Sequence, residues 1–202
     1  MCNESISSQI KNEIIAAGTG KLYVVRDFAH YMNDELVTKV LFRLEKSGLL
    51  IRLSRGIYLY PERNRLGIVY PSMYMIANTI AERDKATILP TGAAALNQLG
   101  LSTQVPINAV YQTTGSPRVV RLGNRSIKFK QTAPKNFSYK SNLMPLIVSS
   151  LKELGKQNVN DEVVSRITDI MTNSHEKNLI KVDMALAPSW IRKILLPITK
   201  II

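Results

Sequence analysis

The sequence predicts an α+β protein built from two domains, and three patterns support this prediction. Apolar residues recur at helical spacing along most of the first 46 residues. The segment that follows alternates apolar and polar residues and is interrupted by a glycine. Three short strand-like segments occupy the middle of the chain. Beyond residue 142 the helical spacing returns and continues to the end. A chain of 202 residues is long enough for two small domains with a core each.

The first helical part contains two helices separated by an extended piece. Residues 5–17 place isoleucines along one helical stripe, and a glycine ends the run. Residues 22–25 are rich in β-forming side chains and predict a short strand. Residues 26–31 then form a brief second helix.

A third helix is predicted over residues 35–46, with one apolar side and one polar side. Asn33 or Asp34 is a suitable N-cap, and Ser47 with Gly48 ends the helix. Its apolar residues recur at the spacing of a helix that is buried along one side. The opposite side carries Thr38, Lys39, Phe42, Arg43 and Lys46.

The segment that follows this helix, LLIRLSRGIYLY at residues 49–60, predicts a tight β-hairpin. Arg52 and Arg55 lie near its tip. The order of helix, strand, helix, helix and β-hairpin is that of a winged helix-turn-helix, which we expect over residues 1–65. Such a domain places its third helix in the DNA major groove, and arginines of the hairpin suit phosphates or a narrow minor groove.

The expected DNA contacts follow from this geometry. Thr38, Lys39, Phe42 and Arg43 are the candidates for reading base edges, and Lys21, Arg26 and Lys46 are candidates for phosphate contacts. Phe42 is unusual on a polar helix side, where it suits a thymine methyl group or a protein contact. Winged helices also serve as protein-interaction modules, so this second interpretation stays open.

A boundary is expected at residues 61–71, which hold prolines, a glycine and arginines, and a second domain at 71–202. Ser72 caps a predicted helix that runs to about Asp84, and Thr91 caps a short helix that Gly100 ends. A small antiparallel sheet is expected next, from strands at 109–113, 118–122 and 126–130, followed by a helical C-terminal part. The helices are expected at 143–154, 161–171, 176–186 and 189–202.

The predicted sheet carries an unbalanced positive charge. Between Thr113 and Lys140 there are seven basic residues and no acidic one. Because side chains alternate along a strand, one sheet face is expected to be apolar and the other cationic. Nucleic-acid phosphates and an acidic protein surface are both suitable partners. The candidate contacts are Arg118, Arg121, Arg125, Lys128, Lys130 and Lys135.

Composition and motifs exclude several classes of function. The formal charge of +12 favours phosphate-bearing or acidic partners. One cysteine and two distant histidines, His30 and His175, provide no metal site, and no motif for a cofactor or an enzyme is visible. Thr91-Gly92 resembles a phosphate-cradling turn only weakly, and packing explains it better. No secretory signal or membrane span is visible, so a cytoplasmic, non-enzymatic protein is expected.

Three segments also carry a family resemblance, namely LFRLEKSGLLIRLSRGIYLYP, PTGAAALNQLGLSTQVP and VYQTTGSPRVVRLGNRSIKFKQTAPKNF. Together with LGKQNVNDEVVSRI and ALAPSWIRKIL they resemble the AbiEi-type antitoxin and transcriptional-regulator family over nearly the whole chain. The Pro-Thr-Gly-Ala and Arg-Val-Val-Arg-Leu-Gly segments are the more specific parts of this resemblance.

The resemblance implies a protein with two roles. One role is repression of its own operon at inverted repeats in double-stranded DNA, an arrangement that suits a dimer on DNA. The other is that of an antitoxin against a nucleotidyltransferase-like toxin, with or without a stable complex, as in type IV toxin–antitoxin systems. The resemblance implies that Arg43, Arg52 and Arg55 face the DNA. Phe42 departs from the smaller, polar residue expected at its position.

Overall fold

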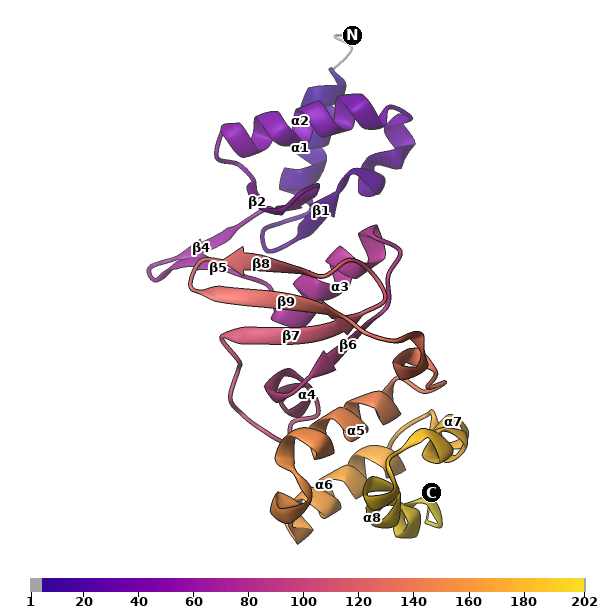
Figure 1. Ribbon diagram of the computed structural model, residues 1–202. Coiled ribbons are helices and arrows are strands. Elements are labelled where there is room, and N and C mark those ends of the chain that lie inside the picture. The colour runs from indigo at the N-terminus through magenta and orange to yellow at the C-terminus, as the bar shows by residue number, and fades with distance from the viewer. Residues whose placement is uncertain (1–4, 202) are drawn as a thin grey trace. The chain divides into compact units, whose positions relative to one another are not determined.

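The computed structural model describes residues 5–201 and has a mixed α+β architecture, as the sequence predicted (Figure 1). The chain divides into two compact units. One holds the described residues up to Lys85 together with Val120–Leu122, and the other holds Ala86–Val119 and the described residues from Gly123 onward. Whether the functional domains have the expected bounds of 1–65 and 71–202 stays a prediction.

The first unit begins with helices α1 (Ile6–Ala16), η1 (Val25–Tyr31) and α2 (Asp34–Lys46). The brief second helix predicted from the sequence is a 3-10 helix, η1. Asn33 is the N-cap of α2, since its Oδ1 accepts a hydrogen bond of 2.9 Å from the backbone N–H of Leu36. The bounds predicted for α2 are confirmed to within one residue.

A three-stranded sheet accompanies these helices, in the order β1 (Leu22–Val24), β3 (Ile57–Leu59), β2 (Ile51–Ser54). Both pairings are antiparallel, and the predicted β2–β3 hairpin is confirmed. Gly56 turns the hairpin at a φ of +70°, a conformation that side chains with a Cβ rarely adopt.

Helix periodicity explains the core of this unit. The apolar stripes of α1 and α2 meet Phe28 of η1 and residues of the hairpin, and water is almost completely excluded there. The buried side chains of this cluster include Ile10, Ile14, Phe28, Val37, Val40, Leu41, Leu50 and Tyr58. Burying one such side chain stabilises the fold by about 1.5–3 kcal/mol. Because this side of α2 faces the core, its polar side points outward.

Residues 61–71, where the sequence predicts a linker or boundary, contain a second hairpin. It is formed by β4 (Glu62–Asn64) and β5 (Gly67–Val69), and Gly67 has a φ of +116°. Prolines at each end isolate the hairpin, and its strands are too short to give an alternating pattern. Helix α3 (Met73–Arg83) follows with the predicted cap, Ser72.

A four-stranded sheet, most of which lies in the second unit, has the order β6 (Ile88–Thr91), β7 (Asn108–Thr113), β9 (Arg125–Gln131), β8 (Arg118–Leu122). The predicted antiparallel pairing is wrong for β7 and β9, which run parallel, whereas β6 and β7 run antiparallel. After β7 the chain forms β8 at the edge of the sheet. It then returns as β9, which lies between β7 and β8. β9 takes the inner position, where Ile127 and Phe129 are buried, and β8 forms the edge.

Helices make up the rest of this unit. Gly92 is the N-cap of helix α4 (Ala93–Gln98), so the prediction of Thr91 as its cap is wrong. Thr91 ends β6, and its hydroxyl donates to the carbonyl of Val110 instead. The later helices, which confirm the predicted helical C-terminal part, are η2 (Pro134–Phe137), α5 (Leu143–Leu154), η3 (Lys156–Asn158), α6 (Asp161–Thr172), α7 (Lys177–Asp183), η4 (Met184–Leu186) and α8 (Ser189–Thr199).

Two carboxylates hold the start of α5. Asp183, 1 % exposed, accepts hydrogen bonds from the backbone N–H groups of Lys140 and Ser141, and Glu176 accepts from those of Asn142 and Leu143. Negative charge is favourable here because the N–H groups at a helix N-terminus have no partner within the helix. None of the helices in the described residues is both long and apolar enough to cross a membrane.

Candidate nucleic-acid interface

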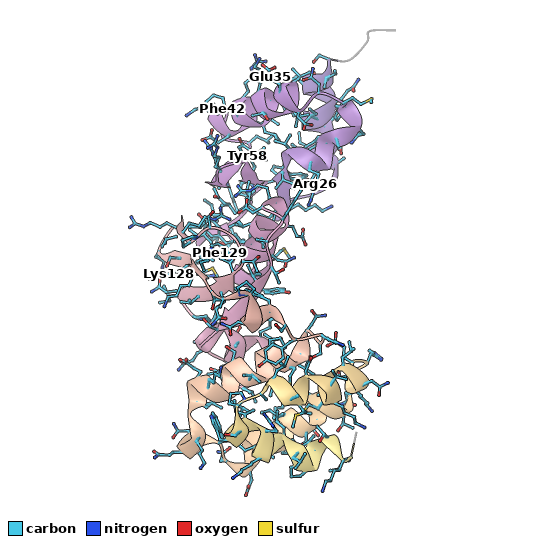
Figure 2. All side chains as sticks on the ribbon, turned by 45° about the vertical axis from the view of Figure 1, so that its right-hand side comes forward. Arg26, Glu35, Phe42, Tyr58, Lys128 and Phe129 are labelled. Carbon is cyan, nitrogen blue, oxygen red and sulfur yellow. The ribbon has the colours of Figure 1, made fainter. Side chains whose placement is uncertain are left out.

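The outward side of α2 gathers the side chains that the sequence singled out. Thr38, Lys39, Phe42, Arg43 and Lys46 are all exposed, and Phe42 has 46 % of its surface accessible. Figure 2 shows Phe42 on α2 with Glu35 near the start of the same helix. Three- and four-residue spacing places these side chains on one helix surface. The structure therefore brings all five together.

Contacts along this side of α2 restrain some of its charges. The Lys39 ammonium lies 2.6 Å from the Glu35 carboxylate, and the Lys46 ammonium lies 5.3 Å from the centre of the Phe42 ring. The hydrogen bond and positive charge of Lys39 lower the pKa of Glu35. Within the described residues no ion pair engages Arg43, so its guanidinium is available to an external partner.

Glu35 is the member of this surface that sequence reasoning missed. It adds a negative charge at the N-terminal end of the helix side that was expected to meet DNA. Its spacing of four residues from Lys39 is the signal that predicts the ion pair.

The hairpin arginines lie on the strand and turn that directly follow α2. Arg52, in β2, and Arg55, in the turn before Gly56, are both exposed. A guanidinium N–H of Arg83 in α3 donates a hydrogen bond to the backbone carbonyl of Arg55, and Arg83 also pairs with Asp84 at 2.7 Å. Arg83 thus holds the hairpin turn through its backbone and leaves the Arg55 side chain outward.

Two other cations were expected to contact phosphates. Lys21 is exposed. The guanidinium of Arg26, labelled in Figure 2, lies 3.9 Å from the Glu82 carboxylate, and both side chains are more than half exposed. An exposed pair at this distance contributes little energy, so it does not prevent Arg26 from contacting another anion.

The basic residues of the sheet do not all share one face. Lys128 and Lys130 are exposed, and Ile127 and Phe129, which alternate with them, are buried. The guanidinium of Arg118 lies 5.3 Å from the centre of the Phe129 ring, so Arg118 packs on the side opposite to the two lysines. Arg121 and Arg125 are exposed on β8 and β9, and the side chain of Lys135 lies outside the described part of the structure.

Metal-ligating side chains do not gather among the described residues of either surface. Among the side chains of residues 5–201 that the structure describes, no group of three or more His, Cys, Asp and Glu residues is placed to hold a metal ion. The chemistry that these surfaces offer is charge, hydrogen bonding and one exposed aromatic ring.

Residues 9–179 match the model of a protein family described as a family of unknown function (DUF6088). The chain belongs to this family. The match to DUF6088 begins within α1 and ends within α7, so it includes α2, the β2–β3 hairpin and the whole sheet of the second unit. A comparison with curated proteins found no match.

Proposed function

We propose that this protein is a DNA-binding transcriptional autorepressor. The observation that carries the proposal is the outward side of α2, with Arg43 free of ion pairs within the described residues, followed directly by a hairpin with exposed Arg52 and Arg55. The order α1, β1, η1, α2, β2, β3, with β1 beside β3, supports a winged helix-turn-helix. In such a domain α2 reads the major groove and the hairpin contacts the backbone or the minor groove.

The proposal assigns a role to the side chains of α2 and the hairpin. Arg43 and Thr38 read base edges, and Lys46 contacts a phosphate. Lys39 stays in its ion pair with Glu35. Phe42 meets a thymine methyl group. Arg52 and Arg55 hold the phosphate backbone, and Arg83 keeps the turn of the hairpin in place. Inverted repeats present two equivalent half-sites, so the protein binds its operator as a dimer.

The antitoxin role is proposed on the resemblance to the AbiEi-type family. It rests on the Pro-Thr-Gly-Ala segment that starts at Pro90 and on the Arg-Val-Val-Arg-Leu-Gly segment that starts at Arg118. In this role the second unit counters a nucleotidyltransferase-like toxin, directly or through its substrate. Co-expression with a nucleotidyltransferase-like protein encoded beside the gene tests it, since an antitoxin restores growth and an unrelated regulator does not.

Fluorescence anisotropy with DNA from upstream of the gene tests the repressor role, with scrambled DNA beside it across a salt series. We expect tight binding that prefers the upstream sequence and weakens steeply with salt, because each phosphate contact releases counterions. Arg43→Ala should weaken binding to the upstream DNA by roughly 1–3 kcal/mol and relax its specificity. Arg55→Ala should weaken binding to both DNAs alike.

Arg166→Ala is the matched control, because Arg166 is an exposed arginine of α6 and lies in the other unit. It should leave the binding of both DNAs nearly unchanged. Equal and weak binding of the wild-type protein to both DNAs would contradict the repressor role.

The exposed ring of Phe42 favours one second candidate, a non-enzymatic interaction protein. An aromatic side chain that is 46 % exposed among cations suits the centre of a protein interface. In this alternative α2 packs on a protein, and the basic sheet of the second unit binds an acidic protein or RNA. Phe42→Ala distinguishes the two candidates, since it would abolish protein binding while changing DNA affinity only modestly.

A further inference from the structure

The second unit contains a small polar cavity of about 90 Å³ between β6, β7 and α5. Apolar residues of β6 and α5 form part of its wall, and the remaining wall is made of side chains that carry hydrogen-bond donors. These polar residues are Thr91, Gln112, Asn136, Tyr139, Ser149 and Lys152.

Secondary structure explains why these side chains meet. Ser149 and Lys152 are three residues apart on α5 and share one side of the helix. Gln112 of β7 lies opposite Leu89 of β6 in the antiparallel register, so both project toward the same face of the sheet. Helix α5 packs against β6 and supplies another wall of the cavity.

The hydrogen-bond partners of these side chains show which donors are available. Thr91 donates to the carbonyl of Val110, and the Tyr139 hydroxyl donates to that of Leu186. Asn136 uses its amide nitrogen on the Thr132 hydroxyl at 2.6 Å and keeps a second N–H.

The other three polar side chains of the wall have their donors free. Within the described part of the chain, no hydrogen bond engages the side chains of Gln112, Ser149 or Lys152. The cavity therefore offers an ammonium, a hydroxyl and amide N–H groups to a ligand that accepts hydrogen bonds.

The charge of the surroundings favours an anion. Among the described residues, no carboxylate lines the cavity. The carboxylate of Glu153, on α5, lies against Gly92, 3.2 Å from the position that a Cβ would take there. Lys130 pairs with Gln112 across β9 and β7, and Lys128 pairs with Val110, so both lysines extend the same sheet face beyond the cavity. Figure 2 labels Lys128 on β9.

The size of the cavity selects among anions. The cavity volume of about 90 Å³ is several times the roughly 10–15 Å³ that a single water molecule requires. A tetrahedral oxyanion fits such a space. Strands are about 4.8 Å apart, so Lys130 stands one strand away from the cavity wall, within reach of a second phosphate of the same ligand.

We propose that this cavity binds the terminal phosphoryl group of a nucleotide, either free or at the end of a single nucleic-acid strand. Lys152 supplies the positive charge, and Gln112, Ser149 and the second N–H of Asn136 donate to the phosphoryl oxygens. Lys130 and Lys128 hold the following phosphates. The site lies wholly in the second unit and does not depend on DNA binding by α2.

Fluorescence anisotropy of a 3′-labelled octathymidylate tests the proposal. We expect the 5′-phosphorylated strand to bind at least tenfold more tightly than the 5′-hydroxyl strand, because only the former places a dianion in the cavity. Lys152→Met should abolish this preference, and Ser149→Ala should reduce it. Lys130→Met should weaken both strands and leave the preference intact. Lys156→Met, which removes an exposed lysine of η3 outside the cavity, is the matched control.

Competition separates the two sources of the phosphoryl group. Displacement of the strand by thymidine di- or triphosphate at similar concentrations identifies a free nucleotide, and displacement only by phosphorylated strands identifies a strand end. Equal affinity for the phosphorylated and hydroxyl strands would overturn the proposal, as would a preference that survives in Lys152→Met. The urea unfolding midpoint of each variant establishes that it is folded.

Discussion

Replacing Asp183 by alanine should destabilise the second unit more than almost any other polar substitution in it. The carboxylate lies 1 % exposed at the end of α7, where it accepts hydrogen bonds of 2.9 and 3.0 Å from the backbone N–H of Lys140 and 2.7 Å from that of Ser141. The contact joins the end of α7 to the segment that starts α5, 42 residues earlier in the chain.

The size of the stability loss depends on whether each of the two N–H groups finds another hydrogen-bond acceptor. Ser141 is 3 % exposed, so its N–H would stay buried without an acceptor, which costs about 2–3 kcal/mol for a bond to a charged group. Lys140 is exposed, and water replaces the carboxylate there at a cost of about 1 kcal/mol. The expected loss is therefore about 3–4 kcal/mol in Asp183→Ala. Asp183→Asn keeps one acceptor oxygen and should lose about half as much.

Urea unfolding followed by tryptophan fluorescence measures this loss. Trp190 is the one tryptophan of the chain, and it packs against the same helical core, so its signal reports on the second unit. Asp169→Ala, which removes an exposed carboxylate of α6, is the control and should stay within about 0.5 kcal/mol. A loss below about 1 kcal/mol in Asp183→Ala would refute the claim that this carboxylate holds the buried N–H groups.

Two further predictions concern single side chains. Glu35→Gln should release Lys39 from its ion pair and let it contact a phosphate. The slope of log K for DNA binding against the logarithm of the salt concentration should therefore become steeper by about 0.9. An unchanged slope in the anisotropy salt series would show that Lys39 does not contact DNA. Burial, and next the charge of Asp183, raises the pKa of Tyr139 above its ordinary value of 10.0, so the neutral phenol stabilises the fold below pH 10 and this contribution is lost as the pH rises further. The urea midpoint of Tyr139→Phe should therefore fall less between pH 9 and 11 than that of the wild type, and parallel curves would contradict this.

Local patterns of the sequence predict the helices, the first hairpin and the distribution of charge. Helical spacing of isoleucines, leucines and valines predicted α1, α2 and α5, because an apolar stripe must be buried whatever it packs on. The same pattern left Lys39, Phe42 and Arg43 on the outward side of α2. The glycine between alternating segments predicted the β2–β3 hairpin for a similarly local reason.

The tertiary structure decided which segments meet. Local alternation identified β9 as a strand, but its parallel place beside β7 depends on packing Ile127 and Phe129 at the centre of the sheet. Arg83 reaches the hairpin turn from 28 residues away in the sequence, and no short-range pattern indicates such a contact.

The polar cavity has the same origin, since Gln112 and Lys152 come from a strand and a helix that only the fold places together. By itself the sequence determined which faces of the elements are apolar and where the positive charge lies, because side-chain periodicity is a property of each element alone. Which faces oppose each other was decided by long-range packing, because contacts between distant segments form only when the whole core closes.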